Sequence, residues 1–425
     1  MPFDQTGPVR RRIAVIGGGI TGMGAALRLA EHHDVTLIEA EGRLGGHART
    51  REVGGVPVDT GFIVFNHATY PRLTRLFAEL DVPTAPSSMS FGVSARGGAL
   101  EYAVLDARAY FAQARNIVSP GHWRMLRDIF RFNGGAEAAV AEDPDMTVRD
   151  LLARMGLGRR FADLYLAPFT GAIWSTPLSG VMDFQAAALL RFFRNHGLMD
   201  MTGQHQWYTV RGGSREYVTR LGAALARAGV ERRLGAPVRS VRRIPLGARV
   251  DGEAFDEVVL ALHSDDALAV LEDADVAERD VLGAIRYQPN EMILHTDPSV
   301  MPKRRRVWSA WNYAEPKEGP GDRIALTYWM NALQPLPEGR DVFVTLNDGG
   351  RIDPATVHDR ATFRHPVLDA AATEAQGRLP DIQGRRATWF CGAWARNGFH
   401  EDGLATAEEV AEAILARPEA AIAAE

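Results

Sequence analysis

The sequence predicts an α/β protein in two parts: a parallel sheet with helices and a β hairpin insertion, and an α+β part with helices and an antiparallel sheet. The run from Ile13 to Ile16 is apolar and rich in β-branched residues, as in a strand buried on both faces of a parallel sheet. Three glycines at G-x-G-x-x-G spacing follow this run and open a helix with small and apolar residues on its inner side. A change to alternating strands from Arg286 onward predicts the second part.

The three glycines serve different physical needs. Gly17 lets the chain turn tightly, Gly19 lets the backbone approach a pyrophosphate, and Gly22 lets the helix pack against the strand. Ile20 and Thr21 start the helix, whose N–H groups and positive dipole end face the phosphates. Glycine turns between a strand and a helix are common, so this motif alone is weak evidence of a ligand.

An acidic residue strengthens the motif. A second strand, from Val35 to Ile38, ends at Glu39, 17 residues after Gly22. A carboxylate at this place can accept hydrogen bonds from both ribose hydroxyls of an adenosine. Strand, glycines, helix, second strand and acid together predict a Rossmann-like domain that binds a dinucleotide.

The segment after the second strand indicates which dinucleotide. It resembles the E-A-x-x-R-x-G-G-R segment of the flavin-containing amine oxidase family, which includes phytoene-desaturase-like and protoporphyrinogen-oxidase-like enzymes. The resemblance rests on Glu39, Ala40, Arg43, Leu44, Gly45, Gly46 and His47. It implies that the glycine pair admits the pyrophosphate of FAD and that the closing residue helps neutralise it. His47 stands where the family has arginine, so we expect weaker neutralisation here, and the second glycine pair favours FAD over NAD.

Three later segments resemble further parts of the same family. The resemblance implies that the backbone of Gly61, Phe62 and Ile63 lies along the flavin, and that Val238, after a proline, pairs with the adenine ring. The ending F-x-G … G-Y-x-E-G-A implies contacts from Gly392, Ala393, Phe399, His400 and Gly403. There the N-terminus of the last helix points at the pyrimidine end of the flavin, where its N–H donors favour the negative charge of the reduced ring.

These segments divide the chain. We expect residues 1–70, 205–285 and 385–425 to form the FAD-binding domain. Residues 71–204, whose periodicity is mostly helical, and residues 286–384, with alternating strands, are expected to form the substrate domain.

Composition excludes several classes of protein. The chain has 425 residues, 46% of them hydrophobic, which is enough for a large core and two domains. Its net charge of -5 argues against nucleic-acid binding through bulk charge. The single cysteine, Cys391, allows no internal disulfide and no cysteine metal cluster, so we expect no metal site and a cytoplasmic location. We find no secretory signal and no apolar run of 18 residues.

The helical region suggests an apolar substrate. The stretches 165–174 and 192–201 are aromatic with few charges, which fits core packing and also fits a tunnel for a long apolar substrate. The helix at 122–132 places arginines among large apolar residues. It is more often an ordinary domain helix, but it could lie on the inner face of a membrane as a peripheral contact.

A lipid substrate is the leading hypothesis. The segments VDTGFIVFN, FFRNHG, RYQPNE and GFHEDG resemble a bacterial branch of this family whose members are often associated with cyclopropane-fatty-acid-synthase-like methyltransferases. That resemblance implies an FAD-dependent oxidoreductase that dehydrogenates a fatty acyl or methyl-branched fatty acyl chain, with a lipid methyltransferase as partner. The candidate bases are His196, His67, His400 and Glu401, although Glu401 could instead cap the last helix.

Two alternatives remain open. An amine oxidase typically holds a lysine near the flavin, on a strand that corresponds to Glu291 to Thr296, and this strand has no lysine. The only lysines of the chain are Lys303 and Lys317. The other alternative is a flavin-dependent isomerase, or a partner protein of a lipid methyltransferase without redox turnover of its own.

Overall fold

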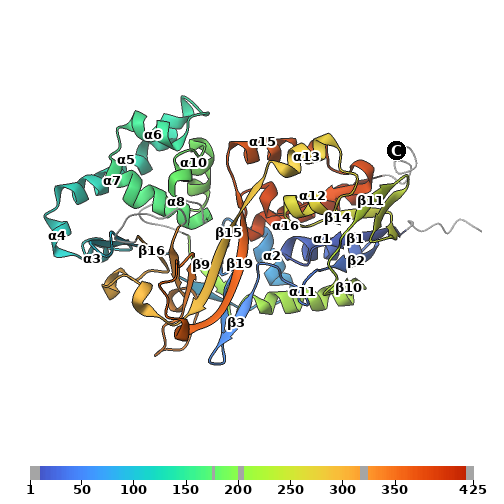
Figure 1. The fold of residues 1–425 in the computed structure, drawn as a ribbon, viewed down its shortest axis with the longest axis horizontal. Coiled ribbons are helices and arrows are strands. Elements are labelled where there is room, and N and C mark those ends of the chain that lie inside the picture. The colour runs from blue at the N-terminus through green and yellow to red at the C-terminus, as the bar shows by residue number, and fades with distance from the viewer. Residues whose placement is uncertain (1–9, 175–177, 200–204, 316–323, 418–425) are drawn as a thin grey trace, which may run out of the picture.

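The computed structural model describes residues 10–174, 178–199, 205–315 and 324–417. Two parts lie side by side, and two long paired strands, β15 (Arg286–His295) and β19 (Val357–Val367), run between them (Figure 1). One part contains a parallel sheet and the other contains helices over a mainly antiparallel sheet. The α/β class expected from the sequence is confirmed.

The parallel sheet has the strand order β10-β2-β1-β14-β20. Its strands are β1 (Arg12–Ile16), β2 (Asp34–Ile38), β10 (Glu231–Arg233), β14 (Glu257–Leu260) and β20 (Thr388–Phe390). All four neighbouring pairs are parallel. Ile13 and Val15 pack into the core on one face, and Ala14 and Ile16 pack into the core on the other. This alternation explains why the first strand is apolar throughout.

Helices cover both faces of this sheet. On one face lie α1 (Ile20–Ala30), α11 (Arg215–Arg227) and α16 (His400–Ala416). On the other face lie α12 (Ser264–Val270), α13 (Val276–Gly283) and α15 (Ala370–Arg378). The result is a three-layer arrangement that brings the carboxyl ends of β1 and β20 to one edge, where α1 and α16 begin.

Two smaller β units flank the parallel sheet. The expected hairpin forms from β3 (Thr50–Val53) and β4 (Val56–Asp59). The second expected hairpin is a three-stranded antiparallel sheet of β11 (Val241–Ile244), β12 (Gly247–Val250) and β13 (Glu253–Phe255). The sequence VRSVRR after Pro237 predicts that the first strand of this sheet begins at Pro237. This prediction was wrong, because Arg239 and Ser240 donate their backbone N–H groups to the Asp251 carboxylate instead of a strand partner, and β11 begins only at Val241.

The second large sheet has seven strands in the order β19-β15-β18-β17-β16-β7-β8. Besides β15 and β19 it contains β7 (Phe91–Ala95), β8 (Leu100–Val104), β16 (Trp311–Ala314), β17 (Leu326–Trp329) and β18 (Phe343–Leu346). We expected a purely antiparallel sheet, and the pair β16–β7 is parallel. Strands β7 and β8 fall in the stretch that we expected to be mostly helical. Strand β7 is buried on both faces and contains Gly92 and Ala95, which have weak strand propensity, so its sequence does not mark a strand clearly.

A short third sheet joins the two parts. It has the order β5-β9-β6, with β5 (Val64–Asn66), β6 (Thr84–Ser87) and β9 (Trp207–Val210). Helix α2 (Pro71–Glu79) follows β5 and packs its apolar side chains into the same core as α16.

The helical layer of the second part comes from one continuous stretch of the chain. Its helices are α3 (Ala107–Tyr110), α4 (Ala114–Ile117), α5 (Pro120–Ala141), α6 (Val148–Met155), α7 (Arg159–Phe161), α8 (Ala167–Trp174), α9 (Leu178–Val181) and α10 (Ala186–Asn195). A short helix, α14 (Met330–Leu333), follows β17. Among the described residues, no helix is both long and apolar enough to cross a membrane.

The buried histidine between α1 and β2 generates a pH prediction. His33 is 8% exposed, and its Nε2 atom lies 3.1 Å from the Arg11 guanidinium. Burial and the Arg11 charge lower the pKa of His33 to about 4. The folded state therefore binds fewer protons than the unfolded state between pH 6.5 and about 4, and the free energy of unfolding falls as the pH falls through this range.

We expect His33→Gln to reduce this loss by about 2 kcal/mol between pH 7 and pH 4.5, as measured by urea unfolding at both pH values. His67→Gln provides the control, since His67 is exposed and is not among the groups that act on His33, so this variant should retain the full loss. Equal pH dependence in His33→Gln and the unmodified chain would contradict the prediction.

Candidate active site

The turn between β1 and α1 is shaped by close contacts that only glycine allows. Gly17 has φ +110°, and a Cβ atom there would lie 2.3 Å from the Ala261 carbonyl oxygen. A Cβ at Gly22 would lie 1.8 Å from the Gly17 carbonyl oxygen. Both glycines are therefore required for the fold of the turn itself.

Gly19 differs from these two glycines. A Cβ at Gly19 would meet nothing within 4 Å, so open space lies in front of the N-terminus of α1. As N-cap residue, Gly19 offers no side chain to the first-turn N–H groups of Ile20 and Thr21. Unsatisfied donors at a helix start, with room in front of them, fit a phosphate group.

Glu39 stands at the end of β2, where we predicted a ribose contact. Its carboxylate accepts the Gly18 N–H at 2.5 Å through one oxygen and the Glu41 N–H at 2.7 Å through the other. The side chain is half-buried and fixed beside the glycine turn, and the next residue, Ala40, is exposed. Both oxygens keep lone pairs that can accept further hydrogen bonds from hydroxyl groups.

The second glycine pair lies directly against the first glycine turn. The Gly45 N–H donates to the Gly18 carbonyl at 2.8 Å, and a Cβ at Gly46 would lie 3.2 Å from the Gly19 Cα. The Arg43 guanidinium donates to the carbonyl oxygens of Gly46 at 3.0 Å and Ala48 at 3.2 Å, which holds the loop closed. Leu44 packs into the core beside α11.

The His47 ring packs among three other rings, whereas the arginine that the family has at this position would carry a permanent positive charge. Its ring centroid is 5.7 Å from that of His263, 5.0 Å from that of Phe363 and 5.9 Å from that of His365. Burial, His263 and Arg43 lower the pKa of His47 to about 4, so the ring is neutral at pH 7. A neutral ring brings hydrogen-bonding capacity to a phosphate but no positive charge.

The segment after β4 crosses over His47. The Phe62 N–H donates to the His47 carbonyl oxygen at 2.9 Å, and a Cβ at Gly61 would lie 2.0 Å from the same oxygen. The Phe62 ring stacks on the His400 ring with 3.9 Å between centroids. Ile63 turns the other way and packs with apolar residues of β15.

The start of α16 lies close to the start of α1. A Cβ at Gly403 would lie 2.5 Å from the Thr21 hydroxyl oxygen and 3.7 Å from the Ala393 nitrogen, so only glycine permits this approach. The Gly392 N–H donates to the Thr406 hydroxyl at 3.1 Å, and the Phe399 N–H donates to the Asp402 carboxylate at 2.9 Å. The two ends of the chain thus present two helix starts to the same edge of the sheet (Figure 1).

His400 is held from two sides at this edge. Its Nε2 atom lies 3.0 Å from the Tyr217 hydroxyl, and Phe62 covers its ring. Burial and the nearby His47 lower the pKa of His400 to about 3, so this ring is also neutral at pH 7. It lies at the helix N-terminus that the sequence assigned to the flavin.

The other three candidate bases lie in different surroundings. Glu401 accepts the backbone N–H groups of Arg72 at 3.1 Å and Leu73 at 3.0 Å, so its carboxylate caps α2. His67 is exposed, with its Nδ1 atom 3.3 Å from the Thr74 hydroxyl. His196 ends α10 and stacks on Phe192 at 3.9 Å, and its ring lies 5.9 Å from that of Phe399, the N-cap of α16. His196 and His400 therefore both lie near Phe399 at the start of α16, whereas the Glu401 carboxylate has a structural role at the start of α2.

Val238 lies two residues after Ala236, whose N–H donates to the Glu39 carbonyl oxygen at 2.9 Å, so the structure places it beside the end of β2. Its side chain is half-buried against the core on the face of the parallel sheet opposite α1.

The sequence analysis missed several residues that hold the site. Asp59 is fully buried, and its carboxylate accepts hydrogen bonds from the Ser214 N–H and hydroxyl, the Thr50 hydroxyl and the Gln334 amide at 2.6 to 3.0 Å. Burial raises the pKa of Asp59 to about 6. An acid as the last residue of the hairpin was the available signal.

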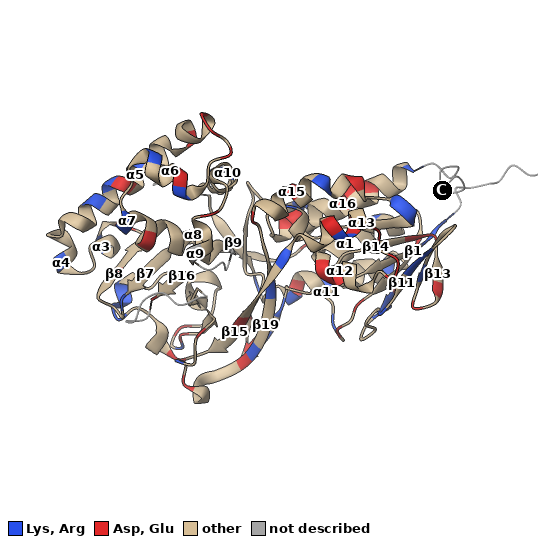
Figure 2. Cartoon of the chain, turned by 45° about the horizontal axis from the view of Figure 1, so that its top comes forward, with Lys and Arg blue, Asp and Glu red and all other residues tan. Residues whose placement is uncertain are grey.

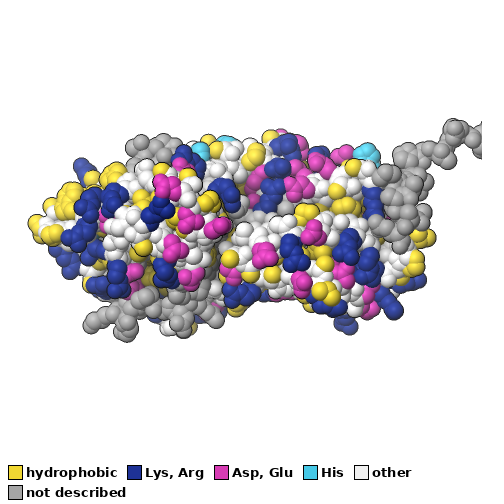
Figure 3. Space-filling model, turned by 90° about the horizontal axis from the view of Figure 1, so that it is seen from above, with side chains coloured by type: hydrophobic (Ala, Val, Ile, Leu, Met, Phe, Trp, Pro, Cys, Tyr) yellow, Lys and Arg dark blue, Asp and Glu magenta, His cyan; other side chains and the backbone are white. Residues whose placement is uncertain are grey.

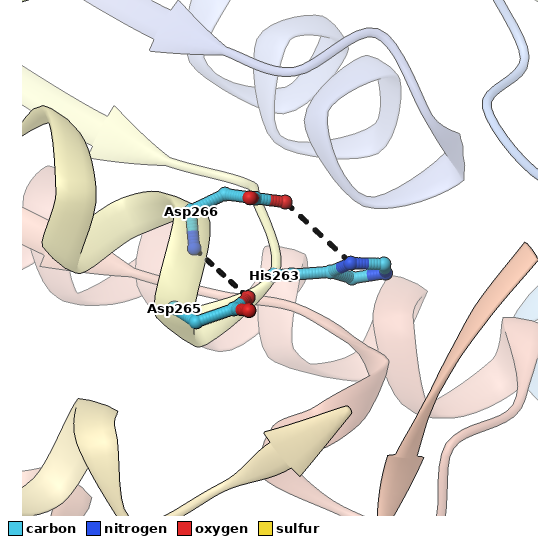
Figure 4. Close-up of side chains that lie close together, drawn as sticks. All are labelled: His263, Asp265 and Asp266. Atoms are coloured by element: carbon cyan, nitrogen blue, oxygen red, sulfur yellow. Dashed lines mark hydrogen bonds and ion pairs between the residues drawn. The ribbon is translucent and has the colours of Figure 1, made fainter. Parts of the chain in front are cut away.

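His263, whose ring is 5.7 Å from that of His47, lies close to two carboxylates, those of Asp265 and Asp266 (Figure 4). His263 Nδ1 lies 3.6 Å from Asp266 Oδ2, and Asp265 Oδ1 accepts the Asp266 N–H at 2.9 Å. Arg364 forms ion pairs with both carboxylates, including one of 2.9 Å to Asp266. Because one guanidinium holds both carboxylates in ion pairs, the group is an ion-pair cluster beside the site.

Comparison with known proteins identifies the family. The model of the flavin-containing amine oxidoreductase family matches residues 20–362. The chain belongs to this family. FAD is accordingly its cofactor. We propose that Glu39 meets its ribose, the glycine turn and the second glycine pair meet its pyrophosphate, and the start of α16 meets its flavin.

Individual relatives are similar over different lengths. The FAD-dependent oxidoreductase dbaF of Emericella nidulans is 41% identical over 95 residues, which is 21% of this chain and 20% of that protein. The chain is thus matched over only about a fifth of this relative's length. Two solved structures share the fold nearly throughout. A CLA-producing fatty acid isomerase from P. acnes has a TM-score of 0.67 and 15% identity, over 95% of this chain and 98% of that chain. The cyclohexylamine oxidase of Brevibacterium oxydans IH-35A has a TM-score of 0.66 and 16% identity, over 96% of this chain and 99% of that chain.

The open space at Gly19 provides a test of the cofactor cradle. We expect Gly19→Val to fold, since its Cβ meets no protein atom, but to bind FAD at least about tenfold more weakly because the side chain fills the phosphate position. Flavin absorbance after gel filtration measures the bound FAD, and circular dichroism checks the fold. Gly134→Val in α5, where a Cβ also meets nothing within 4 Å, is the matched control. Full FAD retention by folded Gly19→Val would contradict the assignment.

Proposed function

We propose that this FAD-dependent oxidoreductase acts on a lipid acyl chain and introduces a double bond into a fatty acyl or methyl-branched fatty acyl substrate. One observation carries the proposal: an aromatic side chain of the helical part meets the start of α16, and it belongs to a core that is rich in aromatic residues. Phe399 stacks on Phe192 at 5.1 Å between centroids, and its side chain packs against the cores of both parts. Apolar surroundings at the reacting end favour an apolar substrate.

Other aromatic rings of this core lie close together. Phe193 lies 5.5 Å from Phe169, which lies 6.0 Å from Tyr165 and 5.2 Å from Phe91, again between ring centroids. These residues come from α8, α10, β7 and the turn before α8. An acyl chain placed along them would exchange contact with water for contact with aromatic rings.

The chemistry requires an acceptor for a hydride and one for a proton. When bound, FAD supplies the hydride acceptor, so that the substrate loses two electrons and two hydrogens from neighbouring carbons. The residues of the chain orient the substrate, keep water away and take the proton.

His196 is the better placed proton acceptor of the two histidines. Its Nδ1 atom lies 2.9 Å from the Phe192 carbonyl oxygen, and such an oxygen can only accept a hydrogen bond. The Nδ1 atom therefore carries the hydrogen, which leaves the Nε2 lone pair available as a base. Burial lowers the pKa of His196, which keeps the ring neutral at pH 7. His400, by contrast, has its Nε2 atom engaged with Tyr217.

The absence of a suitable lysine supports the lipid proposal over an amine oxidase. Strand β15 contains no lysine. Lys303 donates to the Gly97 carbonyl at 3.2 Å in an exposed loop, and Lys317 lies outside the described residues. The structural likeness to a fatty acid isomerase favours a lipid substrate, whereas the likeness to cyclohexylamine oxidase keeps an amine as the alternative.

We propose isomerisation without net oxidation as a variant of this function. We also propose that the enzyme is cytoplasmic and meets its substrate at the inner face of the membrane. A lipid methyltransferase is its proposed partner, because a methyl-branched acyl chain is the product of such an enzyme.

Anaerobic mixing separates these functions. We expect the yellow flavin absorbance of the purified holoenzyme to bleach with phospholipid extracts that contain unsaturated or methyl-branched chains, and to persist with putrescine and simple amines. Bleaching with amines alone would establish the amine oxidase alternative. Shifted double bonds without bleaching, detected by mass spectrometry of the lipid, would establish isomerisation.

The assignment of the base is tested by a pair of variants. His196→Gln should retain FAD and lower the rate of flavin bleaching about 100-fold or more, since general-base catalysis contributes factors of about 10² to 10⁴. His67→Gln, which changes an exposed histidine, should bleach at the unmodified rate. Equal rates for both variants would exclude His196 as the base.

A further inference from the structure

The outer end of the helical part exposes an unusual group of apolar side chains. Leu105, Ile117, Val118, Trp123 and Phe130 are between 49% and 78% exposed. They make up five of the nine large hydrophobic residues that are exposed in the described part of the chain, yet they come from 26 consecutive positions. We call these five residues the end surface. Figure 3 shows apolar side chains gathered at this end of the molecule with basic side chains beside them.

Helix α5 organises the end surface. It begins at Pro120, with the Ser119 side chain as cap, and its inner side buries Met125, Ile129 and Phe132. Its outer side forms an open groove of about 440 Å³, lined by Trp123, Leu126, Arg127, Phe130 and Arg131. These positions repeat every three to four residues, so they form one stripe along the helix.

The short helix before α5 completes the end surface. The Trp123 indole N–H donates to the Ile117 carbonyl at 2.7 Å, and the Trp123 ring lies 4.8 Å from that of Phe111. Trp123 is therefore held in place while half of its surface stays exposed. A large apolar ring fixed in an exposed position is not explained by packing within the chain.

The charge around the end surface is positive. Residues 105–131 contain five arginines and two aspartates, a balance of +3 in a chain whose net charge is -5. Both aspartates are engaged: Asp106 accepts the Ala109 N–H at 2.7 Å as the cap of α3, and buried Asp128 accepts the Gly158 N–H at 3.0 Å. Figure 2 shows basic residues repeated along α5. The arginines Arg108, Arg115, Arg124, Arg127 and Arg131 are exposed.

We propose that the end surface is a docking site for the surface of an anionic lipid bilayer. Apolar side chains with a tryptophan among them enter the boundary between headgroups and acyl chains, and arginines beside them reach the lipid phosphates. Charge complementarity selects this occupant over a second copy of the chain, because two copies meeting through this surface would bring ten arginines together.

This inference stands on the end surface alone and holds whether the substrate is an acyl chain or an amine. It gives the enzyme a fixed orientation, with α5 against the bilayer and the FAD-binding sheet away from it (Figure 1).

Vesicle sedimentation with the FAD-loaded full chain tests the proposal. We expect binding to vesicles of phosphatidylglycerol and phosphatidylcholine, little binding to phosphatidylcholine alone, and weaker binding as salt rises, because salt screens the arginines. Arg124→Gln with Arg127→Gln should lower the partition coefficient about 25-fold, since each basic residue near an anionic surface contributes about fivefold. Ile117→Ser with Val118→Ser should lower it at least about tenfold.

Matched pairs on other surfaces serve as controls. Leu246→Ser with Val276→Ser, and Arg279→Gln with Arg378→Gln, change equally exposed residues elsewhere and should bind as the unmodified chain does. Flavin absorbance confirms that each variant is folded. Absence of binding to anionic vesicles at low salt, or equal loss in test and control pairs, would overturn the proposal. So would a dimer in analytical ultracentrifugation that only the end-surface variants dissociate.

Discussion

The close packing of α1 against α16 is the contact on which the site depends. Gly403 lies so near Thr21 that any side chain at this position would overlap the Thr21 hydroxyl, and a Cβ at Gly24 would lie 2.6 Å from a methyl group of Leu404. Small residues on both helices let their axes approach, and their first turns then open toward the same edge of the parallel sheet. Two helix dipoles from opposite ends of the sequence can thus act on one FAD molecule.

A buried carboxylate holds together segments near that edge that are distant in the sequence. Asp59, at the end of β4, holds Thr50 of β3, Ser214 before α11 and Gln334 after α14 through one buried carboxylate. Burial raises its pKa to about 6, and the hydrogen bonds from Thr50 and Ser214 and the charge of Arg215 offset only part of this effect. The hydrogen bonds that surround it join the hairpin, the returning helix and the large sheet into one support for Phe62 and His400.

Local patterns predicted the elements around the glycine turn, because G-x-G-x-x-G spacing and an apolar strand leave few other folds available. Strands β7 and β8 were missed because both are short and buried almost throughout, so neither presents an exposed polar face to mark it as a strand. The role of Glu401 could not be read from its position, since its partners, Arg72 and Leu73, lie more than 300 residues away in the chain. The histidines around His47 likewise meet only through the fold, so no spacing marked them.

The central claim is that the starts of α1 and α16 act on opposite ends of a single FAD. Hydrogen–deuterium exchange of the chain with and without FAD tests it most directly, because bound phosphate or flavin oxygen protects the N–H groups that it occupies. The account predicts that one FAD per chain slows exchange in both residues 17–23 and residues 399–404. Protection of only the first segment, with unchanged exchange at the start of α16, would contradict it.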